Sequence, residues 1–279
     1  MELHIVLPDE SPTMSAAQLA GLAREAEDLG FDGVWLPDHL LPPGPYGPEQ
    51  YGGVLEPLIT LAHLAAVTER VRLGTSVLVL PLRDPLLLAK QSATLARLSG
   101  DRFVLGVGTG WESYEFDAAN ADFAGRGRRA TEALRLIRRM HTTGGGPYTG
   151  EFHSFDERAV FQPVPDRPVP FLIGGNSGPA LRRAAQLGDW WQGVALSPES
   201  FTEHRDRLRA LTDRPVAAGT RIQWGDDRPA TEVAEEIAAF AAAGADHLAV
   251  WCGEVDGFAE RMRQLVRAGA VRRAHAAGS

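Results

Sequence analysis

Residues 171–188 read FLIGGNSGPALRRAAQLG, which is one complete strand–turn–helix unit. A short apolar run leads into the glycines at 174–178, and an apolar pattern with helical spacing follows from Pro179 to Gly188. Such a turn exposes backbone N–H groups at the start of a helix, where the helix dipole adds partial positive charge. The segment therefore predicts a phosphate site, although an ordinary strand–helix turn would also use glycine for positive φ.

The same unit recurs along the chain. Short apolar runs alternate with helical patterns, several of which begin at a capping residue such as Ser15, Asp84 or Thr231. The predicted strands are residues 3–7, 33–36, 71–80, 103–107, 171–173, 190–194, 216–222 and 247–251. The predicted helices are residues 15–30, 57–68, 84–98, 126–141, 179–187, 198–211, 231–243 and 256–268.

Most of these strands are apolar throughout, which indicates burial on both faces and a parallel sheet. Eight such strands, each followed by a helix, predict an α/β fold of the (β/α)8 TIM-barrel type, formed by one domain over residues 1–270. An open doubly wound sheet is the alternative.

Three segments fall outside the repeating units. Residues 40–56 follow the second strand, are rich in Pro, Gly and Tyr, and are expected to form a lid or a substrate wall. Residues 142–170 form an insertion after the fourth helix, which a small β-hairpin could occupy. The tail at 271–279 is expected to be disordered.

Bulk composition excludes several classes of function. The net charge of −8 argues against nucleic acid as a partner, because binding a phosphate backbone needs clustered positive charge. Cys252 is the single cysteine, so no intramolecular disulfide can form, and it follows an apolar run that favours a buried packing role. Without a recognisable signal peptide or a spanning apolar stretch, we expect a cytoplasmic protein that does not bind membranes.

Polar residues that could take part in catalysis follow two of the predicted strands. They lie at the face of the barrel where enzymes of this fold have their active sites. The second strand ends in Asp38 and His39, and a carboxylate beside an imidazole can set its tautomer and make it a general acid or base. A histidine that merely supports the lid is the alternative. The fourth strand ends in GVGTGWE at 106–112, whose glycines would let a flat molecule approach and whose Trp111 and Glu112 would enter the same mouth.

The sequence contains no motif for metal binding, for a nucleophilic serine or for a nucleotide-binding loop. The histidines do not have the spacing of metal ligands, so we expect no metal, and no Gly-x-Ser-x-Gly elbow or Walker loop is present. Three features remain: an aromatic residue at the barrel mouth (Trp111), the His39–Asp38 pair and the predicted phosphate site at 174–178. A flat, phosphorylated redox cofactor would need these features.

Four stretches in order make the chain similar to a known family. They are GFDGVWLPDHL (30–40), RVRLGTSVLVLPLRDPLLLAKQSATLARLSGDR (70–102), LGVGTGWESYEF (105–116) and FLIGGNSGPALRRAAQLGDWW (171–191). The chain resembles the luciferase-like monooxygenase superfamily, and within it the oxidoreductases that depend on the deazaflavin coenzyme F420.

The resemblance implies a luciferase-like (β/α)8 barrel, usually a homodimer, with coenzyme F420 at the mouth, and FMN as the alternative cofactor. It implies a non-proline cis peptide at Ser76–Val77, in the bulge after the third strand. The residues that it assigns to cofactor binding are Asp38, His39, Ser76, Val77, Thr109, Gly110, Gly174, Gly175, Asn176, Ser177 and Gly178.

The resemblance also implies the reaction. We expect hydride transfer between F420 and a small organic substrate, with reduction of an activated C=C, C=N or C=O bond, and with His39 and Glu112 as catalytic residues. Tyr46, Trp111 and Tyr114 are the expected substrate contacts. F420-dependent sugar-phosphate dehydrogenases carry a catalytic Glu directly after Gly-Thr-Gly, where this chain has Trp111, so sugar-phosphate oxidation by that route is in doubt.

Two other functions stay open from the sequence. One is an FMN-dependent two-component monooxygenase of the same superfamily, because an aromatic mouth and a phosphate cradle would serve either cofactor. The other is a cofactor-binding or light-emission accessory protein without turnover, which would leave the Asp38–His39 pair without a role.

Overall fold

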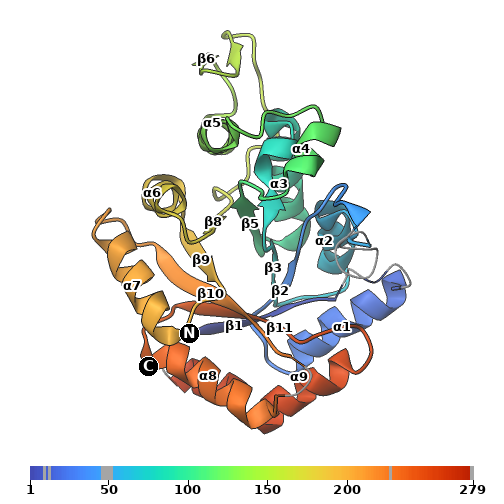
Figure 1. The fold of residues 1–279 in the computed structure, drawn as a ribbon. Coiled ribbons are helices and arrows are strands. Elements are labelled where there is room, and N and C mark those ends of the chain that lie inside the picture. Colours follow the sequence, from blue (N-terminus) through green and yellow to red (C-terminus); the bar gives the residue numbers. More distant parts are fainter. Residues whose placement is uncertain (9–10, 12–13, 45–52, 226–227, 277–279) are drawn as a thin grey trace.

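The computed structural model describes residues 1–8, 11, 14–44, 53–225 and 228–276. Within them, eight parallel strands close into a barrel surrounded by helices (Figure 1). The order around the ring is β3–β2–β1–β11–β10–β9–β8–β5, and pairing of β3 with β5 closes it. The strands are β1 (Glu2–Val6), β2 (Gly33–Leu36), β3 (Arg72–Thr75), β5 (Phe103–Gly108), β8 (Phe171–Gly174), β9 (Trp190–Val194), β10 (Ala217–Gln223) and β11 (His247–Trp251). The predicted TIM barrel is thus confirmed.

The third predicted strand is split in two. β3 is followed by the short strand β4 (Leu78–Val79), and both pair with β5. The peptide bond between them, Ser76–Val77, is cis, as the family resemblance implies. This bulge at the end of a barrel strand is the feature around which the candidate site is built.

The helices lie outside the ring (Figure 1). They are α1 (Ala16–Asp28), α2 (Pro57–Ala65), α3 (Pro85–Ser99), α4 (Ser113–Ala118), α5 (Arg126–Thr143), α6 (Gly178–Leu187), α7 (Pro198–Arg209), α8 (Ala230–Ala242), α9 (Phe258–Arg267) and α10 (Ala270–Ala276), with a 3-10 turn at Leu80–Leu82. Ser15 and Asp84 cap their helices as expected. Thr231 does not, because α8 begins directly after Pro229, whose extended backbone occupies the capping position.

Two helices were not expected from the sequence. α4 is only six residues long, too short for a helical repeat to be visible, and Glu112 caps it. The expected disorder at 271–279 is wrong for residues up to 276, which belong to α10. Ala270 and Ala274 are buried there, and the N-terminal ammonium donates to the Ala274 carbonyl at 3.0 Å. Residues 277–279 lie outside the described part.

The insertion forms the expected hairpin, from β6 (Tyr148–Thr149) and β7 (Ser154–Phe155). The carboxylate of Glu132 on α5 holds its turn, because it accepts the N–H groups of Glu151 (2.6 Å), Phe152 (3.0 Å) and His153 (2.8 Å). Burial acts to raise the pKa of Glu132, but these hydrogen bonds outweigh it and lower the pKa.

Aromatic side chains fill the N-terminal half of the barrel. His4, Trp35, Trp190 and His247 pack ring against ring, and a Cβ on Gly74 would lie 1.4 Å from the Trp35 ring. Burial lowers the pKa of His247 to about 4 and lowers that of His4 as well. The interior is therefore closed at this end, and only the C-terminal end of the strands is available for a site.

Two further observations concern the whole of the described chain. None of its helices has both the length and the apolar character needed to cross a membrane. Cys252 is completely buried, as expected for a packing residue, and burial raises its pKa to about 12.

Candidate functional site

The Ser76–Val77 bulge lies at the centre of the candidate site. The Ser76 hydroxyl donates to Oε1 of Gln192 on β9 at 3.0 Å, and the Ser76 carbonyl accepts from Nη1 of Arg221 on β10 at 3.1 Å. Ser76 and Gln192 are buried. Side chains from two neighbouring strands therefore hold the bulge across the barrel interior.

Glycines make room for the bulge. A Cβ on Gly174 would lie 2.8 Å from Cγ1 of Val77, and a Cβ on Gly108 would lie 2.7 Å from its Cγ2. At Gly106 the obstacle would be the Thr75 carbonyl, at 1.8 Å. The expectation that the glycines of 106–110 admit a flat ligand directly is therefore wrong, because protein atoms occupy that space.

Asp38 supports the same bulge from the opposite side. Its Oδ2 accepts the N–H of Val79 at 2.8 Å, and its Oδ1 pairs with Nη2 of Arg83 at 2.6 Å. Arg83 also pairs with Glu56 at 2.5 Å. Burial raises the pKa of Asp38, although Arg83 and the Val79 N–H act against it. Asp38 is almost fully buried, and both of its carboxylate oxygens are engaged within the protein.

The expected pairing of His39 with Asp38 is wrong. Nδ1 of His39 instead lies 2.9 Å from Oε2 of Glu115 on α4, a residue that no sequence motif indicated. The other oxygen of Glu115 accepts the N–H groups of Leu40 (2.7 Å) and Leu41 (3.0 Å). Asp38 and His39 are adjacent in the chain, yet Asp38 bonds to Val79 and Arg83 while His39 bonds to Glu115.

Aromatic residues border His39. The Trp111 ring meets the imidazole edge to face, with 5.7 Å between centroids, and its side chain is 53% exposed. Tyr114, on α4, is 51% exposed, and the Glu112 carboxylate accepts its N–H at 3.0 Å. The other expected substrate contact, Tyr46, lies outside the described residues.

The turn after β8 has the geometry of an anion site. Gly175 has a φ of 115°, and its N–H donates to the Gln192 carbonyl at 3.0 Å. Asn176 bonds both the N–H and the carbonyl of Val194, and Ser177 caps α6 by accepting the Ala180 N–H. These two side chains are thus used to shape the turn rather than left for a ligand.

Backbone groups at the start of α6 remain for a ligand. In the hydrogen bonds of the described residues, the N–H groups of Ser177 and Gly178 have no acceptor within the protein. A Cβ on Gly178 would lie 3.4 Å from the Arg182 guanidinium, so a cation lies beside them. An anion at this turn would receive backbone hydrogen bonds and a nearby positive charge.

Gln192 links the two halves of the site. Its side chain accepts the Ser76 hydroxyl, while its carbonyl accepts the N–H of Gly175. Thr109 and Gly110 follow β5 nearby, and Gly110 packs against Val79.

Across the described residues, no three His, Cys, Asp or Glu side chains are grouped as metal ligands. The structure thus links the bulge to the glycine turn through Gln192 and to Asp38, the neighbour of the His39–Glu115 pair, through Val79.

Comparisons with known proteins agree with this geometry. Residues 1–230 match the luciferase-like monooxygenase family. An uncharacterized protein of Mycobacterium tuberculosis is 36% identical over 205 residues, which cover 69% of each chain. The F420-dependent glucose-6-phosphate dehydrogenase of Kineococcus radiotolerans is 34% identical over 215 residues, covering 76% of this chain and 61% of that protein.

A solved structure extends the likeness to the whole fold. An F420-dependent secondary alcohol dehydrogenase, in complex with an F420–acetone adduct, superposes with a TM-score of 0.78 over 96% of this chain and 98% of that one. The two sequences are 18% identical, so this comparison concerns the fold alone.

Proposed function

This chain belongs to the luciferase-like monooxygenase family, and we propose that it is an F420-dependent oxidoreductase acting on a small organic substrate. The observation that carries the proposal is the connection through Gln192 between the Ser76–Val77 bulge and the anion turn at 174–178. A phosphorylated ring cofactor needs a surface for its ring and an anchor for its phosphate at a constant separation.

The residues of this chain fit such a cofactor. Val77 would form the surface beneath the ring, because the absence of side chains at Gly108 and Gly174 allows it to stand in the barrel mouth. The N–H groups of Ser177 and Gly178, with Arg182 beside them, would hold the phosphate. Bound F420 would supply the hydride chemistry.

His39 is the proposed proton donor. Glu115 accepts from Nδ1, which assigns the Nδ1–H tautomer to the neutral ring and would stabilise the protonated ring. We infer that the reaction reduces an activated C=C, C=N or C=O bond, with the proton coming from His39. Glu112 is a weaker candidate for this role, since its carboxylate caps α4.

Trp111 and Tyr114 are the proposed substrate contacts. Both are large and about half exposed; Trp111 contacts His39, and Tyr114 directly precedes Glu115, the hydrogen-bond partner of His39. Aromatic side chains of this kind exclude water from a flat substrate while leaving its polar end accessible.

A homodimer and a cytoplasmic location remain predictions. Sedimentation analysis would test the first of them.

Titration of the purified protein with F420 and with FMN tests the proposal. We expect a saturable change of tryptophan fluorescence with F420 at micromolar concentrations and a much weaker response to FMN. Gln192→Leu should raise the F420 dissociation constant about tenfold, because it breaks the link between bulge and turn. Gln223→Leu, which removes an exposed amide from the neighbouring strand, is the matched control. Tight FMN binding without an F420 response would favour the FMN-dependent monooxygenase instead.

A further inference from the structure

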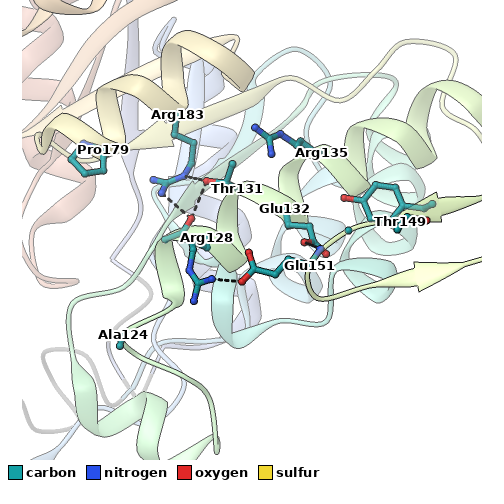
Figure 2. Close-up of a pocket in the computed structure, with 12 residues that line it drawn as sticks. Ala124, Arg128, Thr131, Glu132, Arg135, Thr149, Glu151, Pro179 and Arg183 are labelled. Carbon is teal, nitrogen blue, oxygen red and sulfur yellow. Dashed lines mark hydrogen bonds and ion pairs between the residues drawn. The ribbon is translucent and has the colours of Figure 1, made fainter.

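A second cavity lies outside the barrel. It has a volume of about 700 Å³, within the range typical of small-molecule sites, and α5, α6 and the β6–β7 hairpin line it (Figure 2). None of the lining residues belongs to a barrel strand. We call it the α5–α6 pocket and define it by Arg128, Arg135, Glu151, Pro179 and Arg183, which lie around its wall.

Arg183 gives this pocket a buried positive charge. The residue is 8% exposed, its Nε donates to the Thr131 hydroxyl at 3.2 Å, and its Nη2 donates to the Gly127 carbonyl at 3.1 Å. Both partners are neutral, and in the described part of the chain no carboxylate lies within ion-pair distance of Arg183. Burial lowers its pKa, as expected for a cation without a counter-charge.

The other charges of the pocket do not compensate Arg183. Glu151 pairs with Arg128, and Figure 2 shows the two side chains facing each other. Glu132 is occupied by the backbone N–H groups of the hairpin turn. Arg135 lies farther along the same face of α5 and forms no ion pair within the described residues. The lining therefore carries three positive and two negative charges, and neither Arg135 nor Arg183 forms an ion pair within the described residues.

The Arg183 guanidinium lies against the α5 backbone at Gly127. Its Nη2 donates to the Gly127 carbonyl and would be at van der Waals distance, 3.4 Å, from a Cβ at that position. Figure 2 shows Arg183 reaching from α6 to Thr131 on α5. These contacts hold the planar group in one orientation, and a fixed guanidinium is suited to bind a carboxylate or a phosphate with paired hydrogen bonds.

We propose that the α5–α6 pocket is a binding site for a small anion, which carries a phosphate or carboxylate group and is distinct from the cofactor of the barrel mouth. Arg183 and Arg135 bind the anionic group, and the hairpin covers the rest of the ligand. The site does not depend on which cofactor the barrel mouth binds.

Calorimetric titration of the cofactor-free protein with inorganic phosphate and with succinate tests this site. We expect saturable binding of at least one of them, with a dissociation constant raised about tenfold by Arg183→Gln and raised also by Arg135→Gln. Arg135 is exposed, so its variant remains informative even if Arg183→Gln folds poorly. Arg158→Gln is the control, because it makes the same change of net charge at an exposed arginine that does not line the pocket.

Each outcome decides the matter. If both variants bind the anion as tightly as Arg158→Gln does, the anion binds outside the α5–α6 pocket and the proposal is overturned. The absence of saturable binding would overturn it as well. Repeating the titration with saturating F420 separates the two sources of the anionic group. Unchanged binding supports a separate ligand, whereas complete displacement would assign the anion to the cofactor and contradict a distinct site.

Discussion

Oε2 of Glu115 lies 2.9 Å from Nδ1 of His39, although 76 residues separate them in the chain. Glu115 is almost fully buried, so its hydrogen bond to the imidazole is shielded from water. The same carboxylate accepts two N–H groups of the segment that follows His39. One side chain therefore fixes both the ring and the start of the 40–56 connection.

Replacing Glu115 by Gln should lower turnover at least tenfold. The amide can donate to Nδ1, which reverses the tautomer of His39 and removes the charge that stabilises the imidazolium. We expect the pH profile of kcat to change with it, because Glu115 acts through His39. Asp117→Asn, at an exposed carboxylate of the same helix, should leave both the rate and the profile nearly unchanged.

His39→Ala should also lower turnover by at least tenfold while the fold survives, since general acid catalysis typically contributes about 10²–10⁴-fold. The double variant with Glu115→Gln should be no slower than His39→Ala alone, because the carboxylate has no ring left to orient. Steady-state rates with circular dichroism as the control for folding measure this. Multiplicative losses would show that Glu115 acts independently of His39.

Gly174→Ala should destabilise the protein by about 1–3 kcal/mol, since the new methyl group would lie 2.8 Å from Val77. Urea unfolding measures the change. In the background of Val77→Ala the same substitution should cost much less, because its obstacle is gone. Gly21→Ala in α1 is the control: nothing lies within 4 Å of its Cβ, so we expect stability to hold or rise slightly.

Stability should fall as the pH is lowered from about 6.5 towards 4. Burial lowers the pKa of His247 to about 4 in the folded protein, whereas the unfolded chain titrates near 6.5. The unfolded state therefore binds the extra proton first, and at pH 4 the contribution of His247, about 3 kcal/mol, is largely lost.

Urea unfolding at several pH values tests the His247 effect. His247→Gln keeps a donor for the Trp191 carbonyl but cannot titrate, so its free energy of unfolding should vary less between pH 4 and 6.5. His63→Gln, at an exposed histidine, should follow the parent protein. Parallel curves for the parent and His247→Gln would contradict the assignment.

Local properties of the chain were sufficient to predict its architecture. Residues 33–36, 190–194 and 247–251 are strands as expected, because burial on both faces leaves such segments mostly apolar in the sequence. Ser15, Asp84 and the glycines after β8 act within a few residues of their own position, so their effect on helix ends and turns can be read directly. The number and order of these local units determined the barrel.

Partners distant in the sequence were decided only by the tertiary structure. Gln192 contacts Ser76 across 116 residues, and Arg221 contacts it across 145. Nothing in the chain near Glu115 or Arg183 indicates that the first meets His39 or that the second lacks a counter-charge. Such pairings depend on strand order, register and the height of each side chain in the barrel, which exist only once the ring has closed.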